Sequence, residues 1–560
     1  MARKIGIGIQ DFHKIIDNNY FYIDKTNFIK EWWENGDDVT LITRPRRFGK
    51  TLTMNMVEQF FSIQYAGGKD LFEGLSIWKD EKYQKLQGTY PVIFLSFAGI
   101  KRDNYQSVRD GIIQEIIDLY AKYRFLLQGD ILNQQEKEYF DYINADMSDA
   151  VAAVSLRRLA VCLNHYYNKK VIILLDEYDT PMQEAYIYGY WNELVNFTRS
   201  FFNLTFKTNP YMERGIMTGI TRVSKESIFS DLNNLKVITT TTNKYGTAFG
   251  FTEQEVMEAL TEYGFEDRMQ DIKEWYDGFI FGKCRDIYNP WSILNFLDTG
   301  ILEAYWANTS SNSLVGKLIR GGSRDIKIVM EDLLKKKSFH TQIDEQIVFN
   351  QLEDDESAIW SLLLAGGYLK VENYSFNEDG EKEYDLVLTN KEVRIVFRQM
   401  IKKWFSRSKT FYNDFIKALL AGDMGAMNTY MNKVALATFS FFDSGKEPSE
   451  ESEPERFYHG FVLGLMVELA DKYTITSNRE SGFGRYDVML EPKRREDDAV
   501  ILEFKVHNSN KEKDLQDTVK AALQQIEDKK YAAALEAKGI QTERIRKYGF
   551  AFKGKEVLIG

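Results

Sequence analysis

The first 240 residues alternate short apolar runs with longer stretches whose apolar residues recur at helical spacing. The apolar runs are DVTLITR (38–44), PVIFLSFAG (91–99), VIILLDE (171–177) and RGIMTGIT (214–221). Helical spacing is clear at residues 105–123 and 191–206. Continuous β-branched strands separated by helices are typical of a parallel sheet that is covered on both faces. The pattern therefore predicts an α/β architecture.

The pattern changes near residue 289. Helices with charged faces follow, as in NPWSILNFLDTG and SRDIKIVMEDLLKKKS, and then comes a Ser/Glu/Pro stretch, SGKEPSEESEPE, at residues 444–455. Such a stretch cannot bury a core, and it predicts a linker or a mobile loop. At 560 residues the chain is too long for one hydrophobic core. We expect an α/β domain at residues 1–300, a helical middle region at 301–444, which would couple its two neighbours, and a compact domain at 445–560.

The segment RPRRFGKT, residues 44–51, ends like a phosphate-binding loop. The pattern G-x-x-x-x-G-K-[ST] has Gly where Arg44 stands, so the segment is either an unusual nucleotide site or a basic surface turn. A phosphate loop needs backbone N–H groups at a helix N-terminus, a Lys for the outer phosphates and a hydroxyl for Mg²⁺. Gly49, Lys50 and Thr51 supply these in the required order, between a strand and a helix.

A second motif strengthens the nucleotide interpretation. The buried strand VIILLDEYD ends in Asp176 and Glu177. The first acid would orient Mg²⁺ through water, and the second would polarise the attacking water. Together the two motifs predict a site for ATP and Mg²⁺, with Thr51 and Asp176 near the metal. The residues expected to hold the cofactor are Arg46, Arg47, Phe48, Gly49, Lys50, Thr51, Leu52 and Asp176.

A third strand, in IMTGITRVSKESIF, ends with Thr218, Thr221 and Arg222. A polar group here would sense the γ-phosphate, and Arg222 is the candidate for stabilising charge in the transition state. An ordinary polar strand end is the alternative interpretation.

Several segments resemble the bacterial AAA-ATPase-like family whose members carry a PD-(D/E)XK nuclease domain at the C-terminal end. They are IGIGIQDFHKIIDNNYFYIDKTNFIKE, RPRRFGKTL, LLDEYDTP, TGITRVSKESIFSDLNNL and WYDGFIFG followed by IYNPWSILNFL. In that family PRRFGK is the usual form of the loop. The resemblance implies a P-loop ATPase core of the additional-strand type. Phe12 and Tyr22 are candidates for stacking on the base, or they pack in the core.

The C-terminal domain has a second candidate site in the strands RYDVML and AVILEFKV, which a charged turn separates as in a hairpin. Glu503 and Lys505 lie two residues apart and therefore share a face. Asp487 and Glu503 would hold one or two Mg²⁺ ions, while Lys505 orients water for attack on a phosphodiester. This arrangement is similar to that of the PD-(D/E)XK nucleases, with Tyr486 in place of Pro. Surface salt bridges on a small α/β domain are the alternative.

The flanking helices of this domain add further candidates. PERFYHGFVLGLMVELADKY precedes the strands, and DLQDTVKAALQQIEDKKYAAAL follows them. Gln525 is a candidate catalytic residue in the second helix, which also contains Tyr531. Glu455 and His459 are candidate helper residues in the first.

Composition narrows the choice of function. The net charge of -11 argues against coating nucleic acid by bulk charge, but it allows a local basic groove. The last fifty residues do carry a small excess of Lys and Arg. Two cysteines, Cys162 and Cys284, and five histidines exclude a Cys/His zinc cluster and a disulfide framework. We find neither a membrane span nor a signal peptide, so we expect a cytoplasmic protein.

Two functions follow from these motifs. The first is an ATPase coupled to a Mg²⁺-dependent nuclease that acts on DNA more readily than on RNA. The second is a nucleotide-switched protein that binds nucleic acid or a partner through an inactive nuclease-like domain. A homo-oligomer would be needed if an arginine finger acts in trans, although no residue marks itself as one.

We predict that Lys50→Ala abolishes ATP binding and that Arg44→Gly leaves it largely intact. The first Gly of the loop mainly eases a tight turn, and Pro45 fixes the entry of this loop by other means. The side chains of Arg44, Arg46 and Arg47 would then add charge around the phosphates or face outward. A nucleotide-binding assay on the two variants checks this, and the reverse order of effects would contradict it.

Overall fold

The computed structural model describes most of the chain. The described residues are 2–222, 229, 232–306, 313–344, 352, 357–404, 409–442, 452–478, 486–509 and 511–560. The chain forms two compact units, Met1–Ser310 with Ser338–Arg394, and Ser311–Lys337 with Ile395–Gly560. Residues 301–444 are divided between these units, and they contain strands as well as helices. Whether the three expected ranges act as separate domains stays a prediction.

The first unit is built on a parallel five-stranded sheet, and four of its strands lie in the apolar runs that predicted a parallel sheet. Its strands, in spatial order, are β2 (Val92–Ser96), β3 (Val171–Asp176), β4 (Met212–Gly219), β1 (Val39–Thr43) and β5 (Leu235–Ile238). Strand β4 therefore lies between the strand that precedes the phosphate loop and the strand that ends in the two acids. This is the additional-strand order that the resemblance implied, so the predicted fold class is confirmed.

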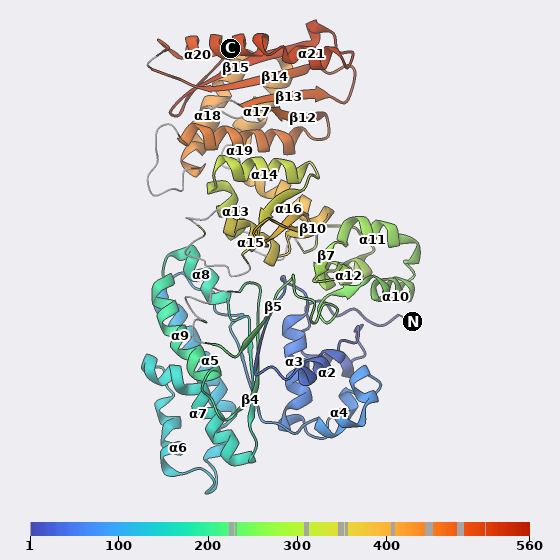
Figure 1. The fold of residues 1–560 in the computed structure, drawn as a ribbon, viewed down its shortest axis with the longest axis vertical. Coiled ribbons are helices and arrows are strands. Elements are labelled where there is room, and N and C mark those ends of the chain that lie inside the picture. The colour runs from blue at the N-terminus through green and yellow to red at the C-terminus, as the bar shows by residue number, and fades with distance from the viewer. Residues whose placement is uncertain are drawn as a thin grey trace. The chain divides into compact units, whose positions relative to one another are not determined.

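Helices cover both faces of this sheet (Figure 1). One face packs against α3 (Lys50–Phe61) through an apolar core that includes Met54, Val57 and Phe60 on the helix and Ile172 and Leu174 on β3. The other helices of this part are α1 (Phe12–Asp17), α2 (Asn27–Asn35), α4 (Glu81–Leu86), α5 (Tyr105–Lys122), α6 (Gln134–Tyr139), α7 (Asp149–Tyr167), α8 (Thr180–Tyr188) and α9 (Trp191–Phe206). Figure 1 shows α5, α7 and α9 on the side of the sheet opposite α3.

A small antiparallel sheet follows in the same unit. It consists of β6 (Phe251–Thr252), β8 (Cys284–Tyr288) and β7 (Phe279–Phe281), with α10 (Glu253–Tyr263), α11 (Met269–Tyr276) and α12 (Pro290–Thr299). Both ends of α12 carry residues that typically begin and end a helix. The Asn289 side chain accepts hydrogen bonds from the N–H groups of Trp291 and Ser292, Pro290 occupies the first turn, and Gly300 ends the helix in a left-handed conformation.

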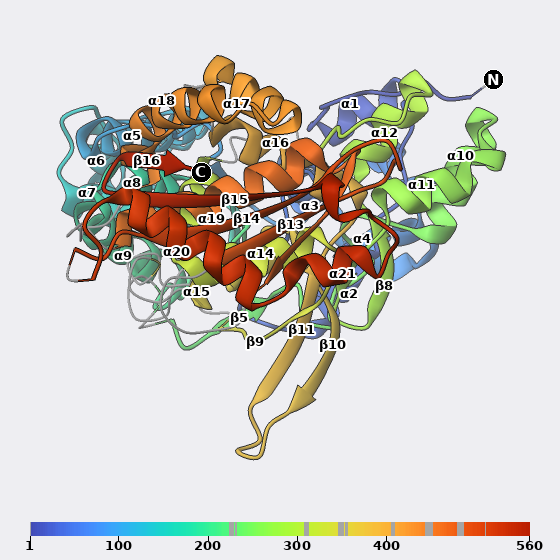
Figure 2. The same cartoon turned by 90° about the horizontal axis from the view of Figure 1, so that it is seen from above.

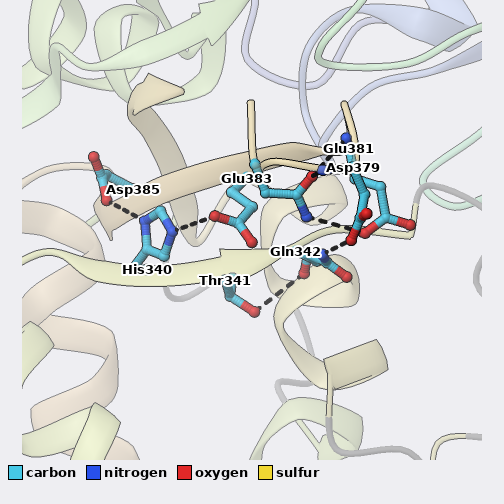
Figure 3. A network of polar contacts seen from close by, with 8 residues as sticks. His340, Thr341, Gln342, Asp379, Glu381, Glu383 and Asp385 are labelled. Carbon is cyan, nitrogen blue, oxygen red and sulfur yellow. Dashed lines mark hydrogen bonds and ion pairs between the residues drawn. The ribbon is translucent and has the colours of Figure 1, made fainter. Parts of the chain in front are cut away.

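The last part of the first unit contains α15 (Ser357–Ala365), the start of α16 (Lys391–Trp404) and a three-stranded sheet. The strands are β10 (Leu369–Phe376), β11 (Lys382–Leu388) and β9 (Phe339–Gln342). Figure 2 shows β10 and β11 as a long hairpin. His340 joins β9 to β11, because its Nδ1 lies 2.8 Å from Asp385 and its Nε2 lies 2.9 Å from Glu383 (Figure 3). The hydrogen bonds to Asp385 and Glu383 raise the pKa of His340.

The second unit is built on a mixed five-stranded sheet. In spatial order its strands are β12 (Tyr473–Asn478), β13 (Tyr486–Pro492), β14 (Ala499–Val506), β15 (Ile545–Lys553) and β16 (Glu556–Ile559), and only β14 and β15 run parallel. Its helices are α13 (Ser313–Gly321), α14 (Arg324–Leu334), the remainder of α16, α17 (Lys409–Ala421), α18 (Met424–Phe442), α19 (Ser452–Leu469), α20 (Leu515–Asp528) and α21 (Tyr531–Glu536). The two predicted strands, β13 and β14, and the helices predicted before and after them, α19 and α20, are confirmed, and β12 is a further strand between α19 and β13.

Helices α19 and α20 pack on opposite faces of this sheet. Phe504 of β14 contacts Phe461 of α19, while the next residue, Lys505, donates a hydrogen bond to the carbonyl of Ala521 in α20. Helix α19 begins at Ser452. The predicted linker at 444–455 is therefore helical from residue 452 onward, and its earlier part lies outside the described residues.

Gly549 of β15 lies directly under α20. A Cβ atom there would come within 2.9 Å of the carbonyl oxygen of Val519 and 3.0 Å of the Ala522 side chain. We expect Gly549→Ala to lower the free energy of unfolding by about 1–3 kcal/mol, because helix and strand would have to separate. Gly425→Ala is the control, since its nearest neighbour would lie 3.6 Å away. Urea denaturation of both variants checks this, and equal stability would contradict it.

Candidate functional site

The loop between β1 and α3 has the backbone of an anion-binding turn. Arg47 and Gly49 both adopt left-handed conformations, with φ of 65° and 81°. Gly49 is the N-cap of α3, and no side chain caps the helix there. The N–H groups of the first turn are therefore left for a ligand, and the dipole of α3 favours an anion at this end.

Lys50 folds back into this loop. Its Nζ donates to the carbonyl oxygens of Arg44 and Pro45, both at 3.0 Å, and the side chain is almost completely buried. Burial lowers the pKa of Lys50, while the nearby Glu177, Asp179 and Asp176 act to raise it. The ammonium group thus lies inside the curve of the loop, where a phosphate group would meet it.

The carboxylate of Asp176 accepts hydrogen bonds from hydroxyl groups on two neighbouring elements. Thr51 on α3 donates to its Oδ2 at 2.7 Å, and Thr218 on β4 donates to its Oδ1. The Asp176 side chain is fully buried, and this burial raises its pKa, against the lowering effect of the two hydroxyls. The adjacent Glu177 has a left-handed backbone, with φ of 50°, and accepts a hydrogen bond from Thr180 at 3.2 Å. The structure therefore brings Thr51 and Asp176 together, as the two motifs predicted.

Arg44 occupies a place that sequence analysis did not consider. It is fully buried, and its guanidinium donates to the carbonyls of Thr43 at 2.9 Å and Thr239 at 2.7 Å, and more weakly to Lys244 and Tyr245. It also stacks on the Phe281 ring, with 4.5 Å between the guanidinium carbon and the ring centroid. Burial lowers the pKa of Arg44 to about 9, so the group stays charged at pH 7. Arg44 neither surrounds the phosphates nor faces outward.

The other predicted loop residues take separate roles. Arg46 donates to the side chain of Gln183 at 3.0 Å, and the guanidinium of Arg47 stacks on Trp291 at 4.2 Å. Phe48 is buried against Phe279 and Phe281. Leu52 is partly buried and packs on the same core. Phe48 and Leu52 therefore act through packing in this structure.

Asp179 is a site residue that sequence analysis missed. Its Oδ2 accepts hydrogen bonds from the N–H groups of Ile220 and Thr221, from the Thr221 hydroxyl and from Gln183. Because Gln183 also contacts Arg46, Asp179 links the phosphate loop to the loop that follows β4. The only sequence signal was an acid three residues after Asp176, which is also ordinary for the start of a helix.

Arg222 lies at the start of that loop and is half-buried. It lines a cavity of about 20 Å³ together with Thr43, at the end of β1, and residues 239–241. Phe12 is fully buried and stacks on Phe72, and it meets Tyr22 edge to face at 5.5 Å. These contacts support core packing for both aromatic residues rather than contact with a base.

The second candidate site lies on the face of the C-terminal sheet that α20 covers. Glu503 pairs directly with Asp487 across the antiparallel ladder of β13 and β14, so the two positions share this face. Glu503 is fully buried, and neither of its carboxylate oxygens has a hydrogen-bond partner among the described residues. The side chain of Asp487 lies outside the described part. A buried carboxylate without partners is costly, and a cation would satisfy it.

The remaining predicted residues are placed around this face. Lys505 donates from Nζ to the carbonyl of Ala521 at 3.0 Å, and Gln525 is buried on α20. His459 is buried on α19, the helix on the opposite face, and the side chain of Glu455 on that helix lies outside the described part. Tyr531, the first residue of α21, is partly buried and packs against the apolar core beside it. Among the side chains that the structure describes, no three His, Cys, Asp or Glu residues are grouped to hold a metal.

His507 continues the row of Glu503 and Lys505 and was not predicted. Its Nδ1 lies 3.0 Å from the Thr518 hydroxyl, which in turn donates to Glu512 at 2.7 Å. Since the one hydroxyl proton is directed to the carboxylate, Nδ1 must donate to Thr518. This network fixes the orientation of the imidazole just after the end of β14.

Comparisons with known proteins match two parts of the chain to protein families. Residues 6–229 match the model of the family described as predicted AAA-ATPase, and residues 453–560 match that of the PD-(D/E)XK nuclease superfamily. An uncharacterized protein in the vnfD 5′ region of Azotobacter chroococcum mcd 1 is 25% identical over 560 residues, which cover 96% of this chain and 94% of that protein.

A solved structure of the Aeropyrum pernix ORC2 protein is 10% identical, covering 69% of this chain and 98% of its own, with a TM-score of 0.25. In the part of the chain that the structure describes, no helix has the length and apolar character needed to cross a membrane.

The burial of Arg44 changes the expectation for Arg44→Gly. Removing the guanidinium would take away its hydrogen bonds to the carbonyls of Thr43, Thr239, Lys244 and Tyr245 and its stacking on Phe281, so we expect a loss of at least about 2 kcal/mol in the free energy of unfolding. Nucleotide affinity would fall as a consequence of a disordered loop. Arg47→Gln, which removes the guanidinium of an exposed residue on Trp291, is the control and should unfold like the parent. Urea titration with and without ATP measures both effects.

Proposed function

Because the chain joins a predicted AAA-ATPase-like domain to a C-terminal domain of the PD-(D/E)XK nuclease superfamily, we propose that it binds and hydrolyses ATP and uses this to control Mg²⁺-dependent cleavage of DNA. The observation that carries the proposal is Glu503. It is a fully buried carboxylate without a described partner, opposite Asp487 and two residues before Lys505.

At the first site, the loop N–H groups and Lys50 bind the phosphates of ATP. Thr51 and Asp176 would hold Mg²⁺, directly and through water, and their donor set of hydroxyl and carboxylate oxygens suits this ion. Glu177, next to Asp176, polarises the attacking water. Arg222 is proposed to respond to the γ-phosphate, and Asp179 would pass that change from the loop after β4 to Arg46 through Gln183.

At the second site, Asp487 and Glu503 would hold Mg²⁺, which supplies Lewis-acid activation of the scissile phosphate. Lys505 shares the face of Glu503 and orients the water that attacks phosphorus. Gln525 approaches the same face from α20 and would position the DNA strand that is cleaved. We place the protein in the cytoplasm, and assembly into a homo-oligomer is part of the proposal only if an arginine from a second copy completes the first site.

We predict that Glu503→Gln and Lys505→Ala each lower the rate of plasmid cleavage in Mg²⁺ by at least about a hundredfold. Both variants should keep ATP binding and ATP turnover, whereas Lys50→Ala should lose both. The matched control is Lys547→Ala, which removes a lysine from the neighbouring strand whose Nζ pairs with Glu527. Cleavage is measured on plasmid and oligonucleotide substrates, with and without ATP.

Two outcomes would contradict the proposal. Full cleavage by Lys505→Ala would remove the catalytic assignment. Tight DNA binding without cleavage in Mg²⁺ or Mn²⁺ would instead identify a nucleotide-switched binding protein with an inactive nuclease-like domain. Titration of Mn²⁺ into the parent and Glu503→Gln separates these results from simple misfolding, since only the parent should bind the ion.

A further inference from the structure

The second unit contains a cavity of about 200 Å³ that neither candidate site uses. Helices α14, α16 and α19 line it, together with the start of β12 and the residue after β13. Its apolar wall consists largely of Met466, Val467, Tyr473 and Ile475, and all four are buried. The cavity is large enough for part of a small organic molecule, and its wall would suit a flat apolar group.

Three cations open into this cavity. Lys335, Arg398 and Lys493 come from three separate segments, and no carboxylate is part of the lining. The chain as a whole carries 83 acidic residues against 72 basic ones. Three cations in a lining that contains no acid are therefore unusual for this chain, and an anion in the cavity would offset their mutual repulsion.

The three cations differ in the ion pairs and hydrogen bonds that they make with the rest of the protein. Lys335 lies 3.8 Å from the buried carboxylate of Glu331, and Lys493 donates from Nζ to the carbonyl of Ala470 at 2.6 Å. Arg398 is half-buried and makes no ion pair or side-chain hydrogen bond with any residue that the structure describes. A guanidinium has five donors in a planar fork, which fits the oxygens of a phosphate group.

This cavity is separate from the candidate metal centre. Ile475 pairs with Leu490, and Leu490 pairs with Val500 on β14. Val500 is three residues from Glu503, so the two lie on opposite faces of the sheet. A ligand in the cavity would therefore contact the α19 face, while the acids lie under α20.

We propose that this cavity binds a nucleotide, with the phosphate held by Arg398, Lys335 and Lys493 and the base against Tyr473 and Met466. The nucleotide is either free or the 5′-phosphorylated end of a nucleic-acid strand, because the same chemistry recognises both. This site does not depend on hydrolysis of ATP or on cleavage of DNA.

The test uses the full chain with Lys50→Ala, so that the phosphate loop does not contribute. Fluorescently labelled AMP and ADP, and a short single-stranded oligonucleotide with and without a 5′-phosphate, are titrated into it. We expect saturable binding of a mononucleotide, or tighter binding of the phosphorylated oligonucleotide. Adding Arg398→Gln should weaken that binding about tenfold, the loss of one charge-assisted contact.

The controls distinguish a lost contact from a lost fold. Lys336→Gln removes an exposed lysine beside Lys335 that does not line the cavity, and it should bind like the Lys50→Ala parent. Lys493→Gln removes an exposed cation and should also weaken binding without altering thermal unfolding. No saturable binding by any probe, or equal binding after Arg398→Gln and Lys493→Gln, would overturn the proposal. Failure of DNA cleavage would not contradict the proposal of this nucleotide site, because the experiment measures ligand binding and thermal unfolding and not catalysis.

Discussion

The buried carboxylate of Asp176 is the constraint on which the first unit depends. Taking a carboxylate out of water is costly unless hydrogen bonds replace the lost solvation. Here the hydroxyls of Thr51 and Thr218 do so, and they come from α3, which packs on the sheet, and from β4, the strand next to β3. A displacement of α3 would break one of these bonds inside an apolar sheet. The position of the phosphate-loop helix is therefore fixed by the same interaction that prepares the candidate metal ligands.

Arg44 holds the other end of the loop. Its guanidinium binds carbonyls of residues 239–245, a segment that follows β5, and this explains why a Gly is absent from the first loop position. A Gly there would lose these side-chain hydrogen bonds and leave the space beside Phe281 empty. The loop is thus fastened to β3 through Thr51 and to the β5 end through Arg44, while Lys50 and the first N–H groups of α3 stay turned inward.

The features that sequence predicted are those with a local signal. Continuous apolar runs identified four strands of the parallel sheet but not β5, which is less buried, and the two-residue period placed Glu503 and Lys505 on one face. Arg44 and Asp179 could not be understood in this way, because their partners lie about 200 and 40 residues away along the chain. The strands β9 to β11 were missed for a different reason. Strand β9 and most of β10 are polar and at least partly exposed, and β11 is a short strand of mixed polar and apolar residues, so the helical pattern around them determined the prediction of a helical middle region.

The two candidate metal sites differ in the hydrogen bonds that their carboxylates accept from the protein itself. Asp176 already accepts hydrogen bonds from two hydroxyls, so an ion beside it would remove less of a desolvation cost. Glu503 is equally buried, but both its oxygens lack a partner among the described residues. The fold of the second unit therefore carries a desolvation cost that a cation would remove. Because an ion that binds only the folded state stabilises it by mass action, a divalent metal should stabilise the second unit more than the first. A larger stabilisation of the second unit is expected if Glu503 is a metal ligand. Surface salt bridges, the alternative interpretation of these residues, would not produce it.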